Sequence, residues 1–71
     1  MNPFEIEMIR TYADCDMNQV QTAKILYVHK NTVQYHLDLI KRKTGLNPKK
    51  FSDLVELLAR IDRGEFDEKA D

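Results

Sequence analysis

A group of amide, phenol, carboxylate and cationic side chains recurs at helical spacing between residues 31 and 42. With Val33 at zero on a helical wheel of roughly 100° per residue, these side chains fall between about 80° and 200°. Asparagine and glutamine can pair bidentately with adenine, and lysine or arginine can bind guanine or phosphate. This face therefore has the chemistry needed to contact base edges. Its members are Asn31, Gln34, Tyr35, Asp38, Lys41 and Arg42.

The opposite side of the same helix is apolar. Val33, Leu37 and Ile40 lie within about 60° of one another, so they form one stripe that we expect to be buried. A helix with one polar and one apolar side typically packs its apolar side on its own domain and presents its polar side to a ligand.

The ends of this helix are marked by capping residues. It begins either near Lys30, with His29 at the cap position, or at Asn31, with Gln34 as its capping partner. It ends at Gly45, because glycine most readily takes the left-handed cap conformation.

A shorter helix is predicted directly upstream. Asn18 can cap it, since its amide oxygen can accept an early backbone N–H while Gln21 reaches back. Val28 is a lone apolar residue in the following break, which is only about three residues long and too short for antiparallel helices. The stretch 18–45 therefore predicts a helix-turn-helix. The apolar side of its first helix comprises Val20, Ala23, Ile25 and Leu26.

Helices are also predicted on both flanks of this unit. At the N-terminus, Asn2, Pro3 and Glu5 form a capping-box pattern that opens a helix to about Ala13. Its core-facing side consists of Phe4, Met8, Ile9 and Tyr12.

The last helix is expected to open at Asn47-Pro48. Its apolar face is wide, so it either closes the core over the first helix or carries a surplus that packs on another copy or on a missing domain. The face consists of Phe51, Leu54, Val55, Leu57, Leu58 and Ile61.

Length and composition favour one small all-α domain of four helices. A chain of 71 residues can bury only about 60% of its unfolded surface. We expect the domain to cover residues 1–62 and a frayed charged tail to cover residues 63–71. No apolar run is long enough for a membrane span, and the single Cys15 excludes an internal disulfide, which together favour a cytoplasmic setting.

The charge is segregated along the chain. The net charge is -1, but residues 1–18 carry -3, residues 19–50 carry +6 and residues 51–71 carry -4. The positive block coincides with the helix-turn-helix, as expected for nucleic-acid binding. A solvated lysine face is the alternative explanation. Lys41, Arg42 and Lys43 would also be favoured in a last helical turn by the helix dipole alone.

No catalytic or metal-binding pattern is evident. His29 and His36 are seven residues apart without a third ligand, so a metal site is not expected. No nucleophile has a base near it in the sequence, and no glycine-rich phosphate loop is present. We expect neither an enzyme nor a cofactor.

The segment LYVHKNTVQYHLDLIKRKTGLNP resembles the C-terminal helix-turn-helix of the PucR and CdaR group of bacterial transcriptional regulators. The likeness spans most of residues 5–61, and a weaker one to LuxR-type output domains implies the same function. Members commonly carry arginine where this chain has Lys30, Gln34 and His36, so three guanidinium groups are missing. The matching residues are His29, Asn31, Thr32, Tyr35, Leu37, Ile40, Thr44, Gly45 and Leu46.

The resemblance implies a DNA-binding effector domain whose third predicted helix lies in the major groove of double-stranded DNA. Base or mixed contacts are expected from Asn31, Gln34 and Tyr35, and base or phosphate contacts from Lys30. Asp38 would accept from a cytosine amino group, repel phosphate, or pair with Lys41 or Arg42. Phosphate contacts are expected from Lys24, Thr32, Lys41 and Arg42.

Two copies are expected on a repeated half-site, joined through the last helix or through an absent upstream domain. The alternative is a helix-turn-helix fold that has lost DNA binding and serves as a protein-interaction module.

Overall fold

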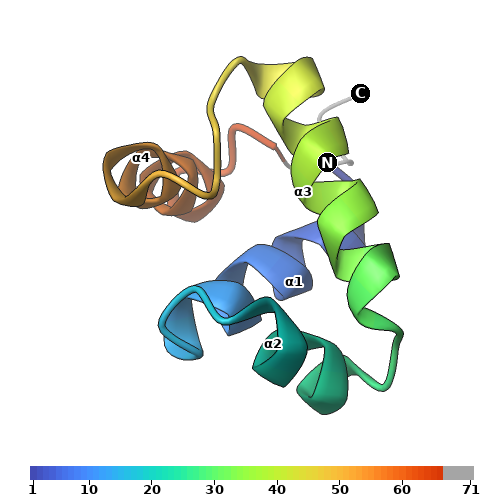
Figure 1. Ribbon diagram of the computed structural model, residues 1–71. Coiled ribbons are helices and arrows are strands. Elements are labelled where there is room, and N and C mark those ends of the chain that lie inside the picture. The colour runs from blue at the N-terminus through green and yellow to red at the C-terminus, as the bar shows by residue number, and fades with distance from the viewer. Residues whose placement is uncertain (67–71) are drawn as a thin grey trace.

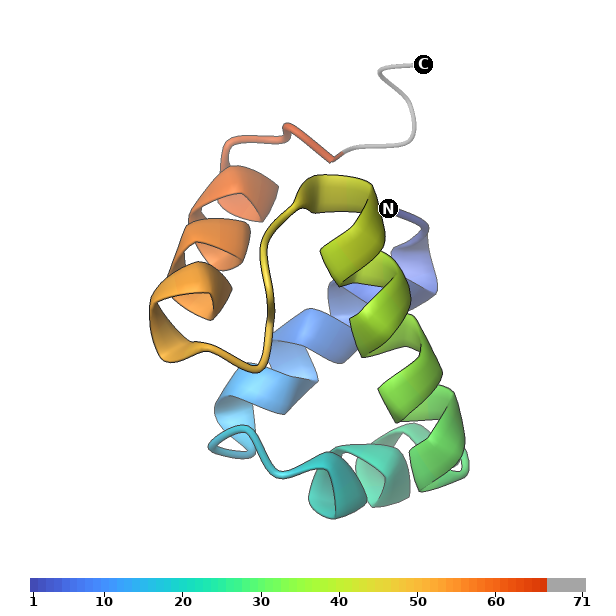
Figure 2. The ribbon, with the colours of Figure 1, turned by 45° about the horizontal axis from the view of Figure 1, so that its top comes forward.

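The computed structural model describes residues 1–66, which form four helices and no strand. Helix α1 (Pro3–Asp14) lies at the centre and packs against the other three helices (Figure 1). Helix α2 (Gln19–Leu26) also packs against α3 (Lys30–Thr44), and α4 (Phe51–Asp62) completes the domain. The turned view in Figure 2 shows α2, α3 and α4 arranged around α1. The predicted small all-α fold is confirmed.

The first turn of α1 has the predicted capping box. Asn2 Oδ1 accepts from the Glu5 backbone N–H at 2.8 Å, and the Glu5 carboxylate accepts from the Asn2 backbone N–H at 3.3 Å. Met8, Ile9 and Tyr12 are buried on the side that faces the core. The capping interaction sets where α1 starts, and the apolar stripe sets which side it turns inward.

Helix α2 is capped by Asn18, whose Oδ1 accepts from the Gln21 backbone N–H at 2.9 Å. Tyr27 ends the helix in the left-handed conformation, with φ 59° and ψ 41°. The Val28 backbone N–H then donates to the Ala23 carbonyl at 3.0 Å, and the Val28 side chain packs against the core. The chain thus turns into α3 within three residues, as predicted.

The predicted apolar side of α2 is wrong in two positions. Ala23 is buried, but Val20 and Ile25 are 48% and 49% exposed. The buried side is instead centred on Thr22, Ala23 and Leu26, which places Val20 and Ile25 about 100° away from its centre. Thr22 can be fully buried because its hydroxyl donates to the Asn18 carbonyl at 2.7 Å.

Helix α3 starts at Lys30, the first of the two predicted positions. His29 is the N-cap, and its Nδ1 accepts from the Asn31 backbone N–H at 3.0 Å. Val33, Leu37 and Ile40 are at most 1% exposed, which confirms the predicted stripe.

The far end of α3 is also closed as predicted. Gly45 adopts φ 78°, and its backbone N–H donates to the Lys41 carbonyl at 2.9 Å. Leu46 then packs against the core from the connection to α4.

The predicted start of the last helix is wrong by several residues. Helix α4 begins at Phe51, whereas Asn47 and Pro48 form a turn before it. The Asn47 backbone N–H donates to Asp53 Oδ2 at 2.9 Å, and the Asn47 side chain accepts from the Lys49 backbone N–H at 3.1 Å. These bonds give Asn47 a turn conformation that competes with helix initiation there.

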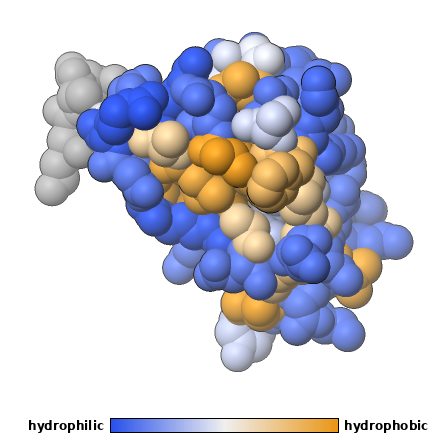
Figure 3. Space-filling view, turned by 90° about the vertical axis from the view of Figure 1, so that its left-hand side faces the viewer, coloured by the Kyte–Doolittle hydropathy of each residue, from blue (hydrophilic) through white to orange (hydrophobic). Residues whose placement is uncertain are grey.

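Helix α4 is only partly covered by the core. Leu54, Leu57 and Ile61 are buried and Leu58 is half-buried, but Phe51 is 72% exposed and Val55 is 47% exposed. Figure 3 shows hydrophobic residues gathered on the side of the molecule where α4 lies. Two explanations were given above for the wide apolar face. These exposures agree with the second, in which the face has more apolar residues than the core covers.

Residues 63–66, the first part of the predicted tail, form turns against the end of α4. The Gly64 backbone N–H donates to the Ile61 carbonyl at 3.0 Å, and half-buried Phe66 packs against the core. The remaining tail residues, 67–71, lie outside the described residues. None of the described helices combines the length and apolarity needed to span a membrane.

Candidate nucleic-acid interface

The outward side of α3 carries most of the residues predicted to contact a ligand. Tyr35 is 56% exposed. The predicted phosphate ligand Lys24 is also exposed, but it lies in the last turn of α2 rather than on α3. The exposed members on α3 are Lys30, Asn31, Tyr35, Asp38, Lys41 and Arg42. Among these exposed residues, the four cations Lys24, Lys30, Lys41 and Arg42 outnumber the single carboxylate of Asp38.

Two predicted contact residues are less accessible than the others. Thr32 and Gln34 are half-buried in the first turns of α3. The Gln34 side chain is also already bonded, because its Nε2 lies 3.0 Å from both carboxylate oxygens of Asp38. Gln34 therefore takes part in a side-chain pair with Asp38 one turn along the helix, and not in capping.

The ion pair of Asp38 differs from the predicted one. Among residues 1–66, the cation within ion-pair distance of Asp38 is Lys49, whose Nζ is 3.6 Å from Oδ1, and neither Lys41 nor Arg42 forms this pair. The hydrogen bonds from Gln34 lower the pKa of the Asp38 carboxyl, and the charges of Lys49 and Arg42 act in the same direction. Asp38 is therefore a stable negative charge on the surface of α3.

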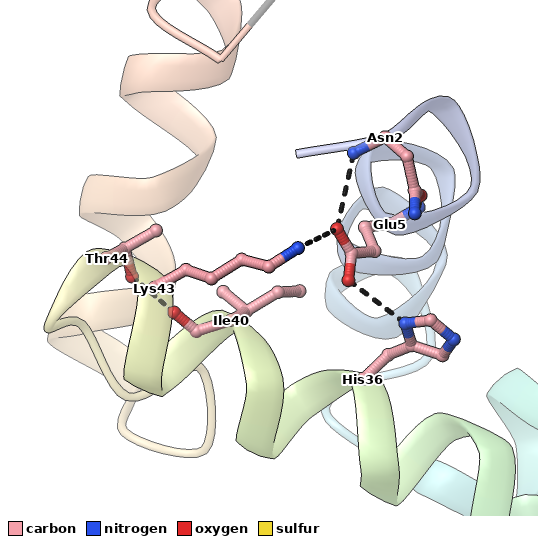
Figure 4. Close-up of polar contacts among 6 residues, drawn as sticks. All are labelled: Asn2, Glu5, His36, Ile40, Lys43 and Thr44. Carbon is pink, nitrogen blue, oxygen red and sulfur yellow. Dashed lines mark hydrogen bonds and ion pairs between the residues drawn. The ribbon is translucent and has the colours of Figure 1, made fainter. Parts of the chain in front are cut away.

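Two other basic side chains of α3 turn inward toward a buried carboxylate (Figure 4). His36 Nδ1 lies 3.0 Å from Glu5 Oε2, and Lys43 Nζ lies 3.5 Å from Glu5 Oε1. An ionised carboxylate can only accept, so His36 donates from Nδ1. The Glu5 side chain is 0% exposed, whereas that of Lys43 is 48% exposed. This Glu5 cluster joins the first turn of α1 to the middle and end of α3.

The environment of Glu5 favours its charged form. Burial raises the pKa of the carboxyl, but the hydrogen bonds from His36 and from the Asn2 backbone N–H, with the charges of Lys43 and His36, lower it below its ordinary value. A buried charge that is matched by several partners is tolerated, whereas one left without them is costly. The cluster thus holds α3 on α1 by charge as well as by apolar packing.

The cluster also reaches a residue of the candidate interface. The ring of His36 makes edge contacts with Phe4 at 5.1 Å and with Tyr35 at 5.2 Å between centroids. Edge-to-face contacts at this separation are favourable for aromatic rings. His36 therefore borders the core and supports the exposed ring of Tyr35 from its inner side.

Sequence reasoning missed the partners of these residues. Glu5 was assigned only to capping, Lys43 only to the helix dipole, and Lys49 had no assigned role. The carboxylate of Glu5 meets residues 31 and 38 positions away, and spacing along a helix cannot reveal such pairs. Among residues 1–66, no group of three or more potential metal ligands is present.

Comparisons with known proteins agree with this geometry. The model of the PucR C-terminal helix-turn-helix domain matches residues 6–62, which is most of the chain. A "Leucine-rich protein" of Streptococcus dysgalactiae subsp. equisimilis is 49% identical over 38 residues, covering 54% of this chain and only 14% of that protein. No solved structure matches. Because the family model covers α2, the turn and α3 together with both flanking helices, the chain belongs to the PucR C-terminal helix-turn-helix domain family, which indicates a DNA-binding role in regulation.

Proposed function

We propose that the chain binds double-stranded DNA sequence-specifically as the effector domain of a bacterial transcriptional regulator. The observation that carries the proposal is the two-sided character of α3. Its apolar stripe is buried against the domain, while Lys30, Asn31 and Tyr35 stand exposed at its N-terminal half. Helix-turn-helix domains place that half of the second helix against base edges in the major groove.

Base contacts are assigned to Asn31 and Tyr35, with Gln34 and Asp38 acting as a pair. The Gln34 Nε2 group donates to Asp38. The bidentate contact to adenine needs both the NH2 and the carbonyl of the amide, so it is not available in this rotamer. The Gln34 carbonyl and the Asp38 carboxylate can still accept hydrogen bonds. The pair therefore suits an exocyclic amino group, from adenine or cytosine, facing it in the groove.

Phosphate contacts are assigned to Lys24, Thr32, Lys41 and Arg42, with Lys30 serving either a base or a phosphate. Such contacts fix the position of the domain on the duplex without specifying sequence. With about five of them, log affinity falls against log salt with a slope of roughly -4 to -5. Lys43 is excluded from this set because it faces Glu5.

A homodimer through α4 accounts for the exposed Phe51 and Val55. Two copies on half-sites one helical turn apart, or a multiple of it, would double the number of base contacts. The chain spans only a small part of the relative described above, so a further region of a longer regulator could also join two copies.

The second candidate is a helix-turn-helix domain that binds protein instead of DNA. The exposure of Phe51 and Val55 favours it, since both belong to an apolar patch outside the core. The diversion of Lys43 toward Glu5 also lowers the charge available for phosphate.

Selection of bound sites from a pool of random duplexes distinguishes the two candidates. The DNA proposal predicts an enriched motif, with two half-sites if the chain dimerises. Fluorescence anisotropy on the enriched duplex then measures affinity at two salt concentrations, and sedimentation measures the oligomeric state. Absence of binding to any duplex at low salt, with a stable dimer in sedimentation, would favour the protein-interaction module.

A further inference from the structure

The turn between α2 and α3 is built on a residue that is poorly suited to its backbone conformation. Tyr27 has φ 59° and ψ 41°, which lies in the left-handed region. Turns of helix-turn-helix units often contain glycine, and asparagine also tolerates this region, but a bulky side chain is disfavoured there. Tyrosine at this position therefore costs the folded state conformational energy.

The left-handed turn lets the Tyr27 and Val28 backbone N–H groups close the end of α2, but that bonding needs no tyrosine side chain. The Tyr27 side chain is 95% exposed, so it contributes almost nothing to the core. The two other non-glycine residues with positive φ are different: Asp16 is a residue type that tolerates this region, and Met17 packs against the core. Of these three residues, Tyr27 is the one with neither a suitable type nor a packing role.

The position of Tyr27 is next to the end of α3 that faces DNA in the proposed complex. Its backbone N–H donates to the carbonyl of Lys24 at 3.3 Å, and two residues later His29 caps α3. In the chain it stands between Lys24 and Lys30, which are both exposed. A tyrosine hydroxyl is a common donor to DNA phosphates and has the reach to meet one beside the groove.

We propose that Tyr27 is a DNA-backbone contact, with its phenol hydroxyl donating to a phosphodiester oxygen at the edge of the major groove. The assignment rests on the proposed DNA binding and adds a residue to it. It also gives the strained turn a purpose, because residues in rare backbone conformations concentrate at functional sites. A contact to phosphate acts alike on all sequences, so Tyr27 contributes affinity without base preference.

Two substitutions in the 71-residue chain separate the contact from the backbone effect. Tyr27→Phe keeps the ring and the backbone strain and removes only the hydroxyl. Tyr27→Asn removes the ring and supplies a residue type that tolerates positive φ. Each variant is measured by thermal unfolding and by anisotropy on two labelled duplexes of roughly 20 base pairs, the selected site and a scrambled sequence.

Tyr27→Phe should leave the melting temperature unchanged and weaken binding to both duplexes about 5-fold. Tyr27→Asn should raise the melting temperature by about 4–8 °C and weaken both duplexes about 10-fold. Stability and affinity would then change in opposite directions, which a purely structural residue cannot produce.

Three results would overturn the assignment. A lower melting temperature for Tyr27→Asn would make Tyr27 a structural residue. Unchanged affinity of both variants, with the parent chain binding normally, would show that Tyr27 does not touch DNA and would leave the proposed function intact. No binding by the parent chain itself would remove the proposed function together with this assignment.

Discussion

At the scale of single residues, Asp38 sets the character of the interface. It is an exposed carboxylate on the cationic side of α3, and it engages Gln34 and Lys49. A negative charge at this position lowers the affinity for every phosphate nearby, and it also withholds one lysine from them. Its benefit in the proposed complex is selectivity, since it suits a base with an amino group in the groove.

Replacement of Asp38 by alanine should therefore strengthen binding while weakening discrimination. We expect affinity for a scrambled duplex to rise several-fold and the salt slope to steepen by about 1, because Lys49 becomes free for phosphate. Anisotropy titrations over a series of salt concentrations measure both quantities. Glu56→Ala removes a half-buried acid from α4 that, like Asp38, is paired with cations, and it serves as the charge control. An equal gain in that variant would contradict a local role of Asp38.

Gln34→Ala should alter the preference at one position of the selected site. The expected loss of discrimination is about 1–3 kcal/mol at that base pair, with little change elsewhere. Repeating the selection with the variant measures this directly. A uniform loss across all positions would assign Gln34 to phosphate or to folding instead.

At the scale of helices, buried faces marked by a regular repeat of apolar residues were predictable from the sequence. Faces and ends that depend on side-chain hydrogen bonds were not. The stripe of α3 was evident because three apolar residues recur in register, and Gly45 marks its end. The face of α2 was misjudged because the helix is only eight residues long and contains a buried threonine whose hydroxyl bonds to the backbone. The start of α4 was misjudged because Asn47 bonds to Asp53 and Lys49.

The corrected face of α2 can be checked by an alanine substitution on its exposed side, with a buried leucine of α3 as the reference site. Leu37→Ala, which empties a fully buried site in α3, should destabilise the domain by about 2–5 kcal/mol. Ile25→Ala, on the exposed side of α2, should change the free energy of unfolding by less than about 0.5 kcal/mol. Urea denaturation followed by circular dichroism compares the two. A loss above about 1.5 kcal/mol for Ile25→Ala would restore the original prediction that Ile25 faces the core.

The tie between α1 and α3 should be sensitive to acid. The folded-state pKa of Glu5 lies below its ordinary value of 4.5, so its charge stabilises the fold at neutral pH. That contribution is fully present above about pH 4.5 and is lost as the pH falls through the lower, folded-state pKa.

Glu5→Gln tests this tie because it keeps the shape of the side chain and removes its charge. Lys43 then loses its anionic partner and the His36 ring N–H loses a charged acceptor, and we expect a loss of roughly 1–3 kcal/mol at neutral pH. The loss should shrink as the pH falls below 4.5 and through the folded-state pKa of Glu5, where the parent chain also loses the charge. An equal loss at every pH would show that packing, and not charge, explains the effect.

At the scale of the whole molecule, the positive charge and the exposed apolar residues of α4 belong to different segments of the chain. Residues 19–50 carry a net charge of +6, although the full chain carries -1. The exposed apolar residues of α4, Phe51 and Val55, belong to a different helix from the exposed cations of α2 and α3. In the proposed assembly, α2 and α3 meet DNA while α4 meets a second copy.

Phe51→Ser should test the second of these surfaces. Phe51 is 72% exposed, so its loss should alter the free energy of unfolding by less than about 0.5 kcal/mol. If α4 forms the dimer contact, the variant should sediment as a monomer at concentrations where the parent chain dimerises, and it should bind a paired site less tightly but a single half-site equally well. Unchanged association would place the contact between copies elsewhere.

The central claim is that the outward side of α3 binds duplex DNA, and an anisotropy titration of the selected duplex at about 50 and 200 mM salt tests it most directly. The predicted slope of -4 to -5 corresponds to a loss of affinity of roughly 250- to 1000-fold between these conditions. Lys41→Ala should weaken all duplexes alike and lower the slope by about 1. Failure of the parent chain to bind any duplex at the lower salt concentration would contradict the claim.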